Sequence, residues 1–67
     1  MSRIRWYRHR RGLTLEQVAK RTGLRIATVS EIERGKQSPT LDSLSKLAHA
    51  LRIPLARLVQ PERRTKK

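Results

Sequence analysis

The residues best suited to chemistry lie between Ile26 and Arg34, where the side chains separate into two faces when placed on a helix. At about 100° per residue, Val29 and Ile32 fall together on an apolar face. The opposite face follows the i, i+3, i+4, i+7 pattern and carries Ala27, Ser30, Glu31 and Arg34. A hydroxyl, a carboxylate and a guanidinium offer hydrogen-bond donors and acceptors that a hydrophobic core does not need. The pattern therefore predicts an exposed recognition surface.

The residue types present argue against catalysis and against metal binding. The chain has no Cys, and His9 and His49 are too far apart in sequence to form a ligand pair, so we interpret both as surface residues. The sequence shows no grouping of a nucleophile with a base and a residue to orient that base. A chain of 67 residues also leaves little volume for a substrate pocket. We predict that the protein is not an enzyme and has no metal site and no cofactor, and no small-molecule ligand is evident from the sequence.

The charge of the chain favours a polyanionic partner. Seventeen Lys and Arg against five Asp and Glu give a formal net charge of +12. A membrane-surface helix is the competing use of such charge, but it would need one continuous amphipathic helix with Trp or Phe along it, and Trp6 is the single Trp. No apolar run approaches the roughly 18 residues of a spanning helix, and residues near the N-terminus lack the apolar stretch expected of a secretory signal. We expect a nucleic-acid partner, no membrane association, and a cytoplasmic, nucleoid-associated location.

Capping and turn residues predict where the first two helices begin and end. The first helix covers about residues 2–10. Thr14 with Gln17 three residues later forms a capping-box pattern, so the second helix begins at Leu15. That helix ends at Gly23, because glycine tolerates the left-handed backbone conformation that a tight turn requires.

Three more helices follow, and the chain is predicted to be all-α because no segment alternates with a period of two. The third helix covers about Ile26 to Arg34, and Thr40 is a good N-cap for the fourth. The fourth helix carries the strongest apolar repeat, formed by Leu41, Leu44, Leu47, Ala48 and Leu51. A short fifth helix has Pro54 at its first position. We predict one domain over residues 1–60 and a basic, disordered tail over residues 61–67, either solvated or a loose phosphate clamp.

In this order and spacing, the motifs resemble the phage repressor and Cro type of helix-turn-helix, the xenobiotic-response-element (XRE) family. The resemblance spans about Ile4 to Val59 and depends on the linked series RxxRGLTxEQVA, RTGLxxxTVSxIERG, SPTLDSLSKLAHAL and IPLARL. It implies a lambda-repressor-like five-helix bundle whose third helix lies in the major groove of double-stranded DNA, which is about 12 Å wide and admits one helix. We expect a transcriptional regulator, a repressor, acting as a homodimer on a two-fold operator.

The resemblance also implies which residues contact DNA. The candidates for base contacts are Ile26, Ala27, Ser30 and Glu31. Phosphate contacts fall, by similarity, at Thr14, Leu15, Arg25, Arg34, Lys36 and Thr40. Glu31 can accept a hydrogen bond from a cytosine amino group, whereas Ile26 lies between the two faces of its helix. Core packing and contact with a thymine methyl therefore both remain open for Ile26.

Some residues depart from the family pattern. Leu15 stands where the family often has a phosphate-binding Gln, and we favour a core role for it. Arg25 replaces the usual Ser cap of the third helix, a loss of about 1 kcal/mol. Arg52 stands where Gly or Asn commonly turns the chain, which costs a similar amount, about 1 kcal/mol.

Trp6 is expected to be a partly exposed packing residue, and an interface role is open for it.

One acidic residue beside the recognition surface has a structural interpretation. The family pairs the position of Glu33 with that of Arg8, and such an ion pair would fix the orientation of the first helix.

The alternative function is a protein-interaction module that keeps the fold without binding DNA. Such a module would present an apolar or acidic surface with aromatic anchors. The basic residues around the third helix favour DNA.

Overall fold

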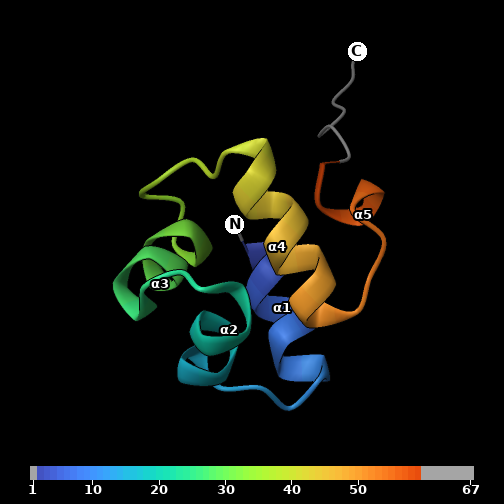
Figure 1. Cartoon of the computed structure of the whole chain (residues 1–67), viewed down its shortest axis with the longest axis horizontal. Coiled ribbons are helices and arrows are strands. Elements are labelled where there is room, and N and C mark those ends of the chain that lie inside the picture. Colours follow the sequence, from blue (N-terminus) through green and yellow to red (C-terminus); the bar gives the residue numbers. More distant parts are fainter. Residues whose placement is uncertain (1, 60–67) are drawn as a thin grey trace.

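A computed structural model describes residues 2–59 of the chain. These residues form five helices, α1 (Ser2–Arg10), α2 (Leu15–Thr22), α3 (Ile26–Glu33), α4 (Leu41–Leu51) and α5 (Ala56–Val59) (Figure 1). No strand occurs between residues 2 and 59, so the predicted all-α five-helix fold is confirmed. The predicted tail, residues 61–67, lies outside the described residues.

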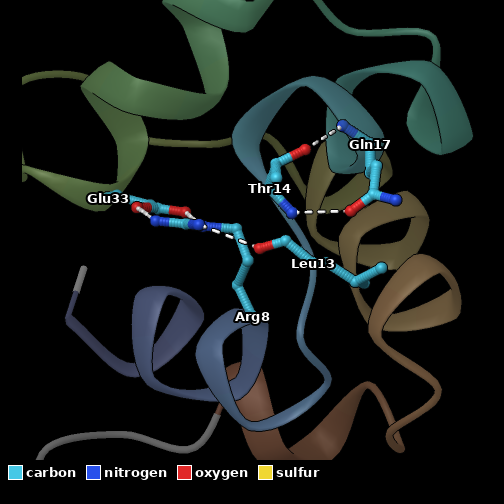
Figure 2. Close-up of polar contacts among 5 residues, drawn as sticks. All are labelled: Arg8, Leu13, Thr14, Gln17 and Glu33. Atoms are coloured by element: carbon cyan, nitrogen blue, oxygen red, sulfur yellow. Dashed lines mark hydrogen bonds and ion pairs between the residues drawn. The ribbon is translucent and has the colours of Figure 1, made fainter.

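The two ends of α2 are fixed by local features that the sequence encodes. Thr14 Oγ1 accepts a hydrogen bond from the Gln17 amide at 3.1 Å, and the Thr14 amide donates to Gln17 Oε1 at 2.8 Å (Figure 2). Both halves of the predicted capping box are present. Gly23 ends α2 with φ +80°, where a Cβ atom would strain the backbone. A tight connection to α3 follows.

The ends of α4 are fixed by one side chain and by a left-handed residue. Thr40 Oγ1 accepts from the Ser43 amide at 3.0 Å and caps the N-terminus. At the other end Arg52 adopts φ 58° and ψ 47°, the conformation predicted to be costly for a residue other than glycine. The Arg11 side chain donates to the carbonyls of Leu51 at 2.8 Å and Arg52 at 3.0 Å, which places a cation at the negative end of the α4 dipole.

All five helices contribute to one apolar core. Helix α4 supplies three of its residues and crosses the middle of the molecule in Figure 1, with α1 behind it. Burying each large aliphatic side chain stabilises the fold by about 1.5–3 kcal/mol. The buried cluster comprises Ile4, Val18, Ala19, Val29, Ile32, Leu47, Ala48, Leu51 and Leu58. This packing fixes the position of α3 against α1 and α2.

Two details of the sequence prediction are wrong. Helix α5 begins at Ala56 and not at Pro54. The turn before it closes with hydrogen bonds between residues three positions apart, such as that from the Arg57 amide to the Pro54 carbonyl at 3.0 Å, and not with the four-position bonds of an α-helix. Leu41 belongs to the apolar repeat of α4 but remains 67% exposed, because the first residue of the helix lies beyond the core. None of the helices between residues 2 and 59 is long and apolar enough to cross a membrane.

Candidate nucleic-acid interface

Helix α3 has one sealed face and one open face. Val29 and Ile32 are fully or almost fully buried in the core. On the opposite side Ala27 is exposed and Ser30 and Glu31 are partly exposed. Ile26 is 45% exposed and is not part of the core cluster, so the structure favours a surface role over core packing for this residue. The open face is therefore a continuous surface of small and polar groups.

A buried ion pair sets the angle of that open face. Arg8 Nε donates to Glu33 Oε2 at 2.6 Å, and Arg8 Nη2 donates to Glu33 Oε1 at 3.1 Å, a two-point contact between α1 and α3 (Figure 2). A third bond runs from Arg8 Nη1 to the Leu13 carbonyl at 3.0 Å. The side chains of Arg8 and Glu33 are 11% and 4% exposed. This pair holds the last turn of α3 against α1 and leaves Glu33 turned away from solvent.

Three exposed cations flank α3 along the chain. Arg25 precedes the first turn of α3, Arg34 follows its last turn, and Lys36 lies in the next loop. Within the described residues, these three side chains form no ion pair and no hydrogen bond. Arg25 is the N-cap of α3 but its side chain does not cap, so the first amide groups of the helix keep no side-chain acceptor there. An anion would find both positive charge and free donors at this end.

The predicted phosphate residues at the other helix starts differ in what they have left to offer. The Thr14 hydroxyl accepts a hydrogen bond in the capping box, and its own proton remains available to an acceptor. The Thr40 hydroxyl also donates to Ser43 Oγ at 3.1 Å, so its proton is already used. Leu15 is half-buried and packs against the core, which agrees with its core interpretation. Leu15 and Thr40 can therefore meet a phosphate only through backbone amides.

Sequence reasoning missed two arginines that hold the end of α4. Arg11 bonds the Leu51 and Arg52 carbonyls, and Arg21 Nη1 approaches the Ala50 carbonyl at 3.5 Å. These contacts join residues at least 29 positions apart. Basic residues near a helix C-terminus can be recognised in sequence only when they belong to the same helix. No local signal in the sequence could have found these contacts.

The fold and these residues match known proteins. A family model described as "Helix-turn-helix" matches residues 4–58. The chain is 34% identical over 58 residues to the HTH-type transcriptional regulator SutR of Escherichia coli K12, and 41% identical over 58 residues to the cryptic phage CTXphi transcriptional repressor RstR of Vibrio cholerae. Both alignments cover 87% of this chain, but only 33% of SutR and 52% of RstR, so it spans about a third and about half of these relatives.

A solved structure shows the same arrangement of helices. The restriction-modification controller protein C.AhdI from Aeromonas hydrophila superposes on this chain with a TM-score of 0.83 at 37% sequence identity. The superposition covers 85% of this chain and 86% of the controller protein. The likeness therefore extends over the whole helical domain and is not confined to α2 and α3.

Proposed function

The chain belongs to the helix-turn-helix family, and on this premise we propose that it is a sequence-specific, double-stranded DNA-binding regulator of transcription that reads the major groove with α3. The observation that carries the proposal is the open face of α3. Its polar groups have no partner among the described residues, and exposed cations stand at both ends of the helix. A groove about 12 Å wide admits one helix, so these groups would meet base edges while the cations meet phosphates.

Each residue of the open face has a role that follows from its chemistry. Glu31 accepts from a cytosine amino group, and Ser30 donates to or accepts from a base edge. Ala27 and Ile26 pack against thymine methyl groups, a role for which the 45% exposure of Ile26 leaves enough surface. These four residues are our proposed base contacts.

The proposed phosphate contacts divide into charged side chains and helix starts. Arg25, Arg34 and Lys36 neutralise phosphates on either side of the groove. Thr14 contributes its hydroxyl proton. The starts of α2 and α4 contribute backbone amides, at Leu15 and Thr40, where the helix dipole favours an anion. Phosphate contacts give affinity and register, whereas the base contacts give specificity.

We propose that the protein represses transcription as a homodimer. A single helical module buries too little DNA surface for tight discrimination, whereas two half-sites about 10 base pairs apart combine their specificities. We assign the dimer surface to α5 and the loop before it, where Val59 leaves 43% of its surface exposed. The name of RstR, a phage transcriptional repressor, favours repression, and that of C.AhdI, a restriction-modification controller protein, favours a controller.

The experiment that tests this proposal is a selection of duplexes from a random pool, followed by gel shifts of the selected and a scrambled duplex at two salt concentrations. We expect at least a thousandfold preference for the selected sequence, whose two halves should be related by a two-fold axis. Light scattering on the complex should give two chains per duplex. Equal binding of selected and scrambled duplexes at both salt concentrations would contradict the proposal, and one chain per duplex would contradict the dimer.

A further inference from the structure

A second feature of the surface lies between α1 and α5. We call it the aromatic hollow. It is an open depression of about 360 Å³ lined by Trp6, Tyr7, Arg10, Arg11 and Arg57. In Figure 1, α3 and α5 lie at opposite edges of the molecule with α1 and α4 between them, and none of the residues that line the hollow belongs to α3. The proposed reading of duplex DNA leaves it unused.

The single Trp and the single Tyr of the chain meet in this hollow. Trp6 is 55% exposed, and its ring centroid lies 5.0 Å from that of Tyr7 at an interplanar angle of 86°. The Arg10 guanidinium carbon lies 5.1 Å from the centroid of the Trp6 ring. The indole is therefore oriented by a ring and a cation while more than half of its surface stays open. Exposed aromatic rings beside arginine are typical of surfaces on which a planar ligand stacks.

Cations line the hollow, and no carboxylate is among its lining residues. Arg57 Nη1 donates to Tyr7 Oη at 3.1 Å, which turns the guanidinium of α5 toward α1. Arg3 Nη1 donates to the Arg57 carbonyl at 2.8 Å and ties the two helices together. Neither Arg10 nor Arg57 forms an ion pair with another described residue. The two walls are thus held in place, with positive charge that no acidic side chain of the described chain neutralises.

We propose that the aromatic hollow binds a nucleotide whose base is unstacked, with the base on Trp6 and the phosphate groups on Arg10 and Arg57. A planar ring and an anion in one ligand match the two chemistries that the hollow combines. A volume of about 360 Å³ is near the lower end of small-ligand pockets, which start at about 300 Å³. Duplex DNA keeps its bases stacked, so the ligand is either a free nucleotide or a nucleotide within a single strand.

Trp6 makes the site measurable, since it is the single Trp of the chain. Its fluorescence should be quenched, saturably, by adenosine triphosphate or by a ten-residue thymidine single strand. Saturation by the triphosphate without competition from the single strand would identify a free nucleotide, and much tighter binding of the single strand would identify a strand. Both results support the proposed chemistry. Inorganic tripolyphosphate, which has charge but no base, should bind at least tenfold more weakly than adenosine triphosphate.

Charge-matched variants separate this site from the general attraction of a basic protein for anions. Arg57→Gln should weaken nucleotide binding about tenfold. Lys20→Gln, which removes the same charge from an exposed position on α2, should change it less than twofold. In calorimetry, Trp6→Ala should lose most of the affinity and Trp6→Phe should keep part of it, because a smaller ring still stacks. Circular dichroism would verify that each variant is folded, and Arg10→Gln replaces Arg57→Gln if the latter is not.

Several results would overturn the proposal. One is an absence of saturable quenching, and another is equal affinity for tripolyphosphate and adenosine triphosphate. A third is competition by poly-glutamate with an affinity equal to that of the nucleotide. Equal losses in Arg57→Gln and Lys20→Gln would also overturn it. Neither Trp6 nor Arg57 is a proposed base or phosphate contact, so the preference for a selected over a scrambled duplex is measured independently of this site. Arg57 lies on α5, which we assign to the dimer surface, so the number of chains per duplex is not an independent measurement. Loss of nucleotide binding with an unchanged duplex preference would therefore overturn this proposal alone.

Discussion

Two glutamates of α3 lie two positions apart and have opposite surroundings. Glu33 is 8% exposed and receives two hydrogen bonds from Arg8, at 2.6 and 3.1 Å. Glu31 is partly exposed, and its carboxylate has no partner within the described residues. Two positions correspond to about 200° of rotation, so the two carboxylates fall on opposite sides of the helix.

Residue type alone does not separate structural residues from proposed recognition residues on this helix. The hydrogen-bonding capacity of Glu33 is used inside the protein, where an unpaired charge would be costly. The hydrogen-bonding capacity of Glu31 remains open and has to be satisfied by water or by a ligand. The same side chain therefore has a structural role on the core side and our proposed recognition role on the outer side.

The largest expected effect is on stability, from Glu33→Gln. This change keeps the shape of the side chain but leaves the buried Arg8 guanidinium without its countercharge, which should lower the free energy of unfolding by about 3–5 kcal/mol. A domain of this size has roughly 3–10 kcal/mol in total, so a sizeable unfolded population is expected at 25 °C. Urea unfolding followed by circular dichroism measures the loss.

The matched control is Glu31→Gln, which should change the free energy of unfolding by less than about 0.5 kcal/mol. Replacing both partners of the pair with apolar residues, as in Arg8→Met with Glu33→Leu, should recover most of the stability because no buried charge remains. Similar losses for the two single variants would contradict the contrast drawn between the two glutamates.

The next effect is on DNA recognition, from Glu31→Ala. If Glu31 accepts from one cytosine, its removal should relax the preference at one base position by about 1–3 kcal/mol and leave the other positions unchanged. Parallel duplex selections with the native chain and the variant would measure this change. A uniform loss at every position, or no change at all, would argue that Glu31 does not read a base.

Arg34→Gln tests the cations that flank the open face. Loss of one phosphate contact should reduce the slope of log affinity against log salt by about 0.9 and weaken selected and scrambled duplexes alike. Lys46→Gln is a useful comparison, because Lys46 lies on α4 and pairs with Asp42 at 3.2 Å. If both variants reduce the slope equally, net charge and not position determines binding.

The fold was largely predictable because the residues that begin and end its helices interact with near neighbours in the sequence. The capping box at Thr14, the turn at Gly23 and the cap at Thr40 involve residues at most four positions apart, and each is confirmed. The apolar periods of α2, α3 and α4 then indicate which sides face the core. Leu41 and the start of α5 were predicted wrongly, because periodicity does not reveal where the core ends or how a first turn closes.

The candidate interface was predictable in its outline but not in its chemistry. The helical period separates Glu31 from Glu33, whereas the family resemblance was needed to pair Glu33 with Arg8 across 25 positions. The hydrogen bond from the Thr40 hydroxyl to Ser43 and those from Arg11 to the last carbonyls of α4 depend on three-dimensional contacts that no sequence pattern encodes. The base and phosphate contacts themselves remain predictions.

The smallest expected effect is on stability, from Arg25→Ser at the other end of α3. Arg25 already has the extended backbone of an N-cap, with φ −76° and ψ 150°, but its side chain makes no capping bond. A serine there should cap the helix and raise the free energy of unfolding by about 0.5–1 kcal/mol, while the salt slope of DNA binding falls by about 0.9. Urea unfolding and gel shifts measure the two quantities.

Arg25→Ala is the control, because it removes the charge without supplying a cap. It should lower the salt slope as much as the serine variant but should not raise the stability. If the serine variant gains stability and keeps the native salt slope, Arg25 is not a phosphate contact. If it loses both stability and affinity, the guanidinium supports α3 itself, and the division of this helix into a structural side and a recognition side would not extend to its first turn.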